Sequence, residues 1–293
     1  HLAGNAVTTG VENVIIGALA GDSLTDSDFN TAVGKSALGN DQLGSRNTAV
    51  GNSALQTQRF TTATNSINSA FGFNAGGAVT TGTASTFIGA HSGDAITSGI
   101  NNTAVGAFSL SADTLGKFSV AVGNGALERQ NFTTATGAYS TAVGYDAGSR
   151  ITTGIYNTLV GGLCGDALTS GNSNVALGYV ALSSDTLGDN NTAIGFQCLA
   201  NQNFTTTTDA YNTAVGYNAG VNVTTGTGNT IVGGLAGDAL RTGVSNIALG
   251  HLTAFSAVDV TAEFVIGAGV AGSGGSTITI GSGAGKISNT FTS

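Results

Sequence analysis

The sequence repeats with a fixed period, and this constrains its fold more than any other feature. A five-residue tag reads Asn-Thr-Ala-Val-Gly at residues 30–34, 47–51, 102–106 and 212–216, and close variants occur along the rest of the chain. The tag glycines are Gly17, Gly34, Gly51, Gly72, Gly89, Gly106, Gly123, Gly144, Gly161, Gly178, Gly195, Gly216, Gly233, Gly250, Gly267 and Gly281. Their numbers rise by 17, 17, 21 and 17 in a recurring cycle, which ends with a shorter, 14-residue step. Four coils therefore form a 72-residue superrepeat.

Features outside the tag follow the same 72-residue period. One is the aspartate of a recurring Gly-Asp pair, at Asp22, Asp94, Asp166 and Asp238. Another is a phenylalanine of the 21-residue coils, at Phe60, Phe132 and Phe204. Independent positions do not share such a spacing by chance, so the chain is expected to consist of stacked, equivalent coils.

The composition of each coil favours β-structure. A helix needs an apolar stripe of period 3.6 over at least ten residues, and a 17-residue period with about three glycines per coil does not supply one. The chain has 47 glycines and no proline in 293 residues, so every backbone N–H is available for a strand ladder. We therefore predict an all-β, parallel β-solenoid of 17- and 21-residue coils stacked about 4.8 Å apart.

The tags resemble the head repeats of YadA-like trimeric adhesins, whose motif reads Asn-Ser-Val-Ala-Ile-Gly. The longer tag segments at residues 140–148 and 212–220, STAVGYDAG and NTAVGYNAG, are more similar still to the repeat regions of phage tail-fibre proteins. The resemblance extends from residue 13 to about residue 281. It implies a left-handed parallel β-roll that assembles as a homotrimeric rod, although the coils here are longer than those common in adhesin heads.

The repeat also suggests how the chain is divided. Residues 1–266 form the repetitive solenoid, and residues 267–293 form a Gly/Ser-rich C-terminal coil and end segment. The register places His1 in mid-coil, so we expect the rest of the fibre to precede it. The C-terminal segment resembles phage fibres that an endosialidase-type intramolecular chaperone matures by cleavage after a serine, which makes Ser293 a possible processing end.

The sequence also predicts association. A coil this small has room for a thin row of inward residues only, so a lone chain would leave a second apolar face in water. Bulk alternates between the central tag residue and the residue after the tag glycine, as in Ala142 with Tyr145 and Phe87 with Ala90. We expect these positions to share a packed interior and to lie near contacts between chains.

The charge pattern argues against several partners. Only 8% of residues are charged, and sixteen acids against eight bases give a net charge of −8. The bases do not cluster, so a nucleic-acid partner is not expected. No segment approaches the roughly 18 consecutive apolar residues of a membrane helix, so membrane insertion is not expected either.

No catalytic constellation stands out. The three histidines, His1, His91 and His251, are too far apart in a solenoid to share a site. Cys164 and Cys198 occupy positions that are small residues in other coils, and we interpret both as buried and unpaired. The Gly-Asp aspartates are interpreted as turn caps, with an ion site between chains as the alternative, and the tag asparagines as a stacked amide ladder. We therefore expect no enzyme activity and no cofactor.

The 21-residue coils carry the only insertions, at residues 58–66, 129–137 and 202–210. Aromatic, amide and hydroxyl groups in such loops suit contact with sugars or proteins. The receptor-contact candidates are Arg59, Phe60, Arg129, Phe132, Tyr139, Phe204 and Tyr211. The alternative, which we favour for the three phenylalanines, is that they turn inward and pin the loops.

These features lead to a structural and adhesive function. We expect a trimeric segment of a phage tail fibre, extracellular as part of the virion, that acts as a rigid shaft and recognises a glycan or protein on the host surface. The alternative is the head domain of a bacterial trimeric autotransporter adhesin on the cell surface. A carbohydrate-cleaving β-helical enzyme is disfavoured, because the acidic residues are spread one or two per coil.

Overall fold

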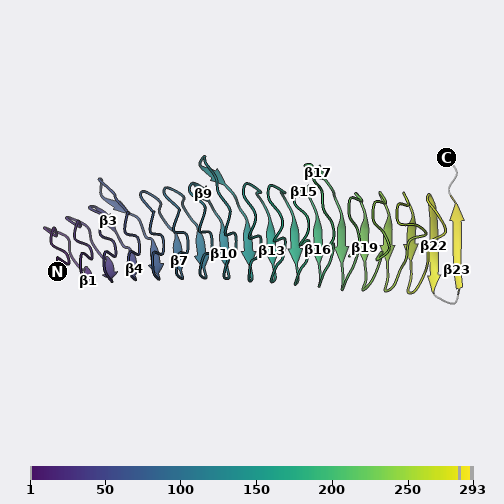
Figure 1. Ribbon diagram of the computed structural model, residues 1–293, viewed down its shortest axis with the longest axis horizontal. Coiled ribbons are helices and arrows are strands. Elements are labelled where there is room, and N and C mark those ends of the chain that lie inside the picture. The colour runs from purple at the N-terminus through teal and green to yellow at the C-terminus, as the bar shows by residue number, and fades with distance from the viewer. Residues whose placement is uncertain (1, 283–284, 291–293) are drawn as a thin grey trace. The chain divides into compact units, whose positions relative to one another are not determined.

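The computed structural model describes the whole chain except residues 1, 283–284 and 291–293. Two units of similar size, His1–Asp146 and Ala147–Ser293, are built from the same kind of coil. Within each unit, strands of successive coils lie side by side (Figure 1). The described residues form an all-β, parallel β-solenoid in which the 17-residue coil predominates, as the sequence predicts.

Each tag forms a short strand, and each 21-residue coil has an additional strand that pairs with one in the preceding coil. In the first unit the strands are β1 (Val14–Ile16), β2 (Thr31–Val33), β3 (Gly44–Ser45), β4 (Thr48–Val50), β5 (Thr64–Asn65), β6 (Ser69–Phe71), β7 (Thr86–Ile88), β8 (Thr103–Val105), β9 (Gly116–Lys117), β10 (Val120–Val122), β11 (Thr136–Gly137) and β12 (Thr141–Val143). In the second unit they are β13 (Thr158–Val160), β14 (Val175–Leu177), β15 (Gly188–Asp189), β16 (Thr192–Ile194), β17 (Thr208–Asp209), β18 (Thr213–Val215), β19 (Thr230–Val232), β20 (Ile247–Leu249), β21 (Phe264–Ile266), β22 (Thr277–Ser282) and β23 (Gly285–Thr290).

The tag strands pair in parallel with their equivalents in the next coil. Between β2 and β4, for example, Ala32 lies opposite Ala49 and Val33 opposite Val50. The pattern ends at the last coil, where β22 pairs in parallel with β21 and antiparallel with β23. The described part of the chain contains no helix that is long and apolar enough to cross a membrane.

In the tags from Gly17 to Gly267, the strand ends at a glycine with positive φ, a conformation that other residues rarely adopt. Gly34 has a φ of +130°, and a Cβ added to it would lie 2.5 Å from the carbonyl oxygen of Gly51 in the next coil. Successive coils approach each other closely at this point, because the ladder spacing leaves no room for a side chain. The glycine of the tags from Gly17 to Gly267 therefore follows from both backbone conformation and coil spacing, whereas Gly281 lies within β22.

The interior of each coil is filled by two positions that exchange bulk. In some coils the central tag residue is alanine and the second position is leucine, as in Ala49 with Leu55, both fully buried. In the Gly-Asp coils the central residue is large, as with Phe87, and the second position is glycine. A Cβ at Gly93, the second position of the Phe87 coil, would overlap the Phe87 ring, and a Cβ at Gly76, the equivalent position of the preceding coil, would lie 2.7 Å from it. Glycine at both positions therefore makes room for the ring.

This arrangement corrects the pairing expected from sequence. Phe87 is buried in its own chain, whereas Ala90 is exposed, so the two do not share one interior. Ala142 and Tyr145 are divided in the same way between the inside and the outside of the coil. Bulk is exchanged within the single-chain core, and the central tag residue does not face a neighbouring chain.

The tag asparagines form the predicted amide ladder. The Oδ1 of Asn30 accepts hydrogen bonds from the backbone N–H of Asn47 at 2.9 Å and from its Nδ2 at 3.1 Å. The Nδ2 of Asn30 donates to the carbonyl of Gly44 at 3.0 Å. In the second unit Asn229 and Asn246 repeat the contact. These side chains are buried, and the ladder satisfies backbone groups at the turn that precedes each tag strand.

Candidate functional site

The insertions of the 21-residue coils are held by a buried carboxylate. The Oδ1 of Asp41 accepts backbone N–H groups of Gln42 at 2.9 Å, Gly44 at 3.2 Å and Phe60 at 3.0 Å. Its Oδ2 accepts the Nε2 of Gln58 at 2.6 Å. Asp41 is completely buried, and four donors compensate for the lost hydration of its charge. The start of the insertion is therefore fixed to the preceding coil.

The same clamp recurs in the other two insertions. Asp113 accepts Gly116 N–H at 3.0 Å, Phe132 N–H at 3.2 Å and the Nε2 of Gln130 at 2.8 Å. Burial raises the pKa of Asp113 above its ordinary range, against the opposing effect of these hydrogen bonds. The third clamp joins Asp185 to the amide of Gln202 and the backbone N–H groups of Gly188 and Phe204.

Sequence reasoning missed this clamp, although a signal for it was present. Asp41, Asp113 and Asp185 follow the 72-residue period, and a glycine stands three positions after each of them. The partner glutamines, Gln58, Gln130 and Gln202, keep the same spacing.

The phenylalanines of the insertions are buried, as the favoured interpretation expects. Phe60 is 7% exposed, and Phe132 and Phe204 are 5% exposed, so the rings pack under the loops. Other receptor-contact candidates lie on the surface: Arg59 and Arg129 are exposed. Among the candidates in the described chain, a ligand can therefore reach Arg59, Arg129, Tyr139 and Tyr211 but not the three phenylalanines.

Two exposed tyrosines follow the second and third insertions. Tyr139 is 55% exposed and its ring stacks on Phe118, with centroids 4.8 Å apart, whereas Tyr211 is 61% exposed. The possible processing end, Ser293, lies outside the described residues.

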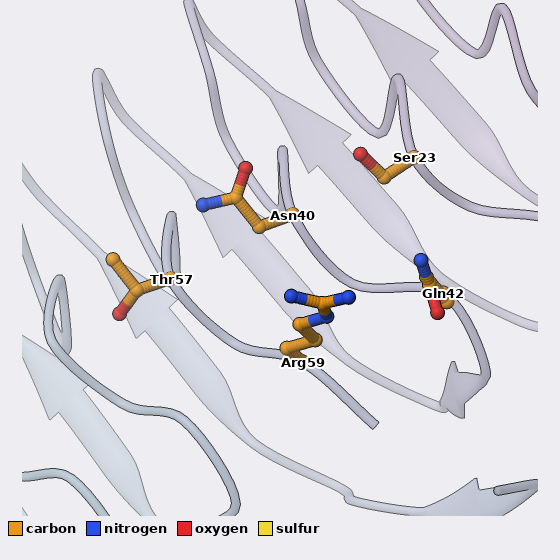
Figure 2. Close-up of a pocket in the computed structure, with 5 residues that line it drawn as sticks. All are labelled: Ser23, Asn40, Gln42, Thr57 and Arg59. Carbon is orange, nitrogen blue, oxygen red and sulfur yellow. The ribbon is translucent and has the colours of Figure 1, made fainter. Parts of the chain in front are cut away.

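A polar hollow of about 460 Å³ lies beside the first insertion (Figure 2). Its lining comes from the turns of three successive coils: Ser23, Asn40, Gln42, Thr57 and Arg59. Ser23, Asn40 and Thr57 are equivalent positions of these coils, as are Gln42 and Arg59. The site thus brings together Arg59, which the sequence singled out, with four residues that it did not.

Gln42 and Arg59 interrupt a row of structural threonines. In neighbouring coils of the first unit this position is Thr25, Thr80 or Thr97, and each donates its hydroxyl to a carbonyl of the next coil at 3.1 Å. The longer side chains of Gln42 and Arg59 make no such bond within the described part of the chain. Their polar groups are therefore free to contact a ligand in the hollow.

The titratable groups make few contacts with each other. His91 Nδ1 lies 2.7 Å from Asp94 Oδ2, and the same oxygen accepts the Nδ2 of Asn74 at 3.1 Å. The His91 ring stacks on Phe108, with centroids 5.4 Å apart. Among the residues described, no three His, Cys, Asp or Glu side chains are grouped to hold a metal ion.

The cysteines are confirmed as buried, unpaired residues. The Sγ of Cys164 donates to the carbonyl of Ala176 at 3.0 Å, and that of Cys198 to the carbonyl of Ala219 at 3.4 Å. Burial raises the pKa of both thiols to about 12. Neither is a thiolate near neutral pH, so neither is suited to nucleophilic chemistry.

An apolar row marks the outer surface of the tag strands. Alternation along each strand turns its central residue inward and its third residue outward. In the first unit these outward residues are Ile16, Val33, Val50, Phe71, Ile88, Val105, Val122 and Val143. In the second unit they are Val160, Leu177, Ile194, Val215, Val232, Leu249, Ile266 and Ile280. We call this set the outer row; none of its members is buried.

The coil architecture makes this chain a β-solenoid repeat protein. No protein-family model, no curated protein and no solved structure gives a significant match to it. The fold class therefore rests on the strand register and the coil period of the chain itself.

Proposed function

We propose that the chain is a non-enzymatic, homotrimeric segment of a phage tail fibre, which serves as a rigid shaft and contacts the host surface. In this proposal the solenoid is left-handed, its 72-residue superrepeat sets the spacing of the loops, and it is extracellular as part of the virion. The second candidate is the head of a bacterial trimeric autotransporter adhesin. The resemblance of the Asn-Thr-Ala-Val-Gly tags to adhesin head repeats favours it.

The observation that carries the trimer is the outer row. Every tag strand contributes an apolar residue to it, and several are strongly exposed in the single chain: Ile16 is 59%, Phe71 41%, Leu177 45% and Ile280 50% exposed. An apolar strip of this kind on each unit is costly in water and is typical of a surface that other chains cover. Parallel association of identical chains about an axis would bury the strip of each chain against the others.

The apolar strip continues onto the last strand of the second unit. Ile287 of β23 lies opposite Ile280 of β22, and it is 77% exposed. A shallow apolar hollow of about 280 Å³ is lined by these two residues together with Ile278 and Asn289. A neighbouring chain would therefore remove apolar surface from water at this end of the unit, as it would along the tag strands.

The contact function depends on the insertions. The Asp-Gln clamps hold three loops in defined positions, and Arg59, Arg129, Tyr139 and Tyr211 are exposed in or beside them. Rigidly held loops lose little conformational entropy when they bind, which suits an adhesive surface. In the proposed trimer each loop would be displayed three times, and weak contacts would add through multivalency.

The encoding gene provides the test that separates the two candidates. An Asp-x-Arg-Leu-Lys run directly after codon 293, followed by a helical chaperone, supports the phage fibre. A coiled-coil stalk followed by a short membrane β-barrel contradicts it and supports the adhesin head. Any other downstream region contradicts both candidates.

A further inference from the structure

The polar hollow beside the first insertion holds several side chains that the fold does not use. The guanidinium of Arg59, the amides of Asn40 and Gln42 and the hydroxyl of Ser23 all line it, and none has a hydrogen-bond partner within the described part of the chain. Figure 2 shows these groups around one opening, with the guanidinium between Thr57 and Gln42. We propose that this hollow binds a carboxylated sugar unit of a surface polysaccharide, an inference that rests on the proposed host-contact function.

Arg59 defines the acidic part of this ligand. Among the described residues that line the hollow it alone is charged, and its planar guanidinium matches a carboxylate through two parallel hydrogen bonds. The nearby carboxylate of Asp41 does not compete, because Gln42, Gly44, Phe60 and Gln58 already donate to its oxygens. The guanidinium of Arg59 is therefore available to pair with an anionic group of a ligand.

The other lining residues define the sugar part of the ligand. Side-chain amides donate and accept hydrogen bonds at once, as ring hydroxyls do, so Asn40 and Gln42 can bond to them together with Ser23. The hydroxyl of Thr57 already donates to the carbonyls of Gly77 and Val79, so only its lone pairs remain available. A volume of about 460 Å³ accommodates a small ligand of this kind.

One acidic residue fixes the orientation of the ligand. Asp22 lines a smaller, neighbouring hollow that shares Asn40. Repulsion from its carboxylate disfavours an anionic group at that side, so the sugar carboxylate points toward Arg59.

The hollow is pre-organised by the clamp. The backbone N–H of Arg59 donates to the carbonyl of Thr80 at 2.9 Å, and the next residue, Phe60, is buried and bonded to Asp41. The arginine therefore extends from a fixed point, which lowers the entropic cost of binding.

The set of residues that lines the hollow is not repeated one superrepeat later. At the equivalent positions one superrepeat later, Asn40 is replaced by Ala112, Gln42 by Thr114 and Arg59 by Asn131.

The experiment uses the complete chain, labelled with a fluorophore, on an array of uronate, nonulosonate, sulfated and neutral oligosaccharides. The variant is Arg59→Gln, and the matched control is Arg150→Gln, which removes the same charge from an exposed arginine outside the hollow and the insertions. We expect binding to one or more carboxylated saccharides, a tenfold or greater loss with Arg59→Gln, and no change with Arg150→Gln. Circular dichroism confirms that both variants keep the wild-type fold.

Three outcomes would overturn the proposal. These are no binding to any carboxylated saccharide, equal binding to sulfated or neutral saccharides, and an equal effect of the two substitutions. Sedimentation of the same samples separates this test from that of the proposed function. A trimer that binds no carboxylated saccharide refutes the site alone, and a monomer that binds through Arg59 refutes the trimer alone.

Discussion

Two adjacent glycines in the second unit allow a sharp test of the coil geometry. Gly233 is a tag glycine with a φ of +137°, and a Cβ added to it would lie 2.6 Å from the carbonyl carbon of Gly250 in the next coil. Gly234 has no positive φ, and the nearest atom to its added Cβ is Cδ2 of His251, at 3.4 Å. Alanine at these neighbouring positions should therefore have very different effects.

The cost of Gly233→Ala follows from the structure. The added Cβ is about 0.8 Å short of an ordinary contact of 3.4 Å, and the coils are tied here by a 2.8 Å bond from Gly250 N–H to the Val232 carbonyl. Relief of the clash stretches this bond beyond hydrogen-bonding length, which costs about 1 kcal/mol. A non-glycine residue at this φ adds about 1–3 kcal/mol. We expect Gly233→Ala to lower the free energy of unfolding by about 2–4 kcal/mol.

Gly234→Ala is the matched control. Its backbone conformation is open to alanine, so the smaller entropy of the unfolded chain should leave stability unchanged or raise it by up to about 1 kcal/mol. Urea unfolding followed by circular dichroism measures both variants, and hydrogen exchange of the peptide around residues 229–253 locates the effect. Equal stability of the two variants, or a loss confined to Gly234→Ala, would refute the geometric reasoning.

Three further predictions concern buried polar groups. Because burial raises the pKa of Asp113, the free energy of unfolding of the wild-type protein should fall as pH rises from 3.8 through that raised pKa, and Asp113→Asn should lack this loss. Urea midpoints between pH 3 and 7 test this, and a constant difference between the two proteins contradicts it. Within the described chain the buried Oε1 of Gln130 has no hydrogen-bond partner, whereas an asparagine donates to the equivalent atom in both other 21-residue coils. Ser140→Asn should therefore add about 1 kcal/mol to the free energy of unfolding, and an unchanged or lower urea midpoint refutes this. Cys164 and Cys198 should resist iodoacetamide at pH 8 and react in urea, as intact mass would show; alkylation of the native protein contradicts their burial.

Much of the fold was predictable because it depends on period alone. The spacing of the tag glycines predicts the coil length, and the parallel register of Ala32 with Ala49 follows from stacking equivalent coils. The amide ladder of Asn30 and Asn47 and the inward position of Phe60 were predictable for the same reason. A side chain that recurs in every coil must meet its own copy above and below.

Contacts between different positions of a coil were not predictable in this way. The space for the Phe87 ring comes from Gly93 and Gly76, not from Ala90, because the path of the turn decides which positions face the core. The clamp of Asp41 and Gln58 joins residues of two different coils, and the hollow at Arg59 depends on it. Such pairings depend on turn geometry, which the repeat spacing does not contain.

The mass of the chain in solution tests the central claim most directly. The proposed trimer of 28.6 kDa chains, which would cover the outer row, predicts a single species of about 86 kDa by sedimentation equilibrium. Replacing Leu177, an exposed member of the outer row, by lysine should weaken this species, whereas Arg129→Gln should leave it intact. A stable monomer of 28.6 kDa at micromolar concentration would contradict the account, since the apolar strip would then remain in water.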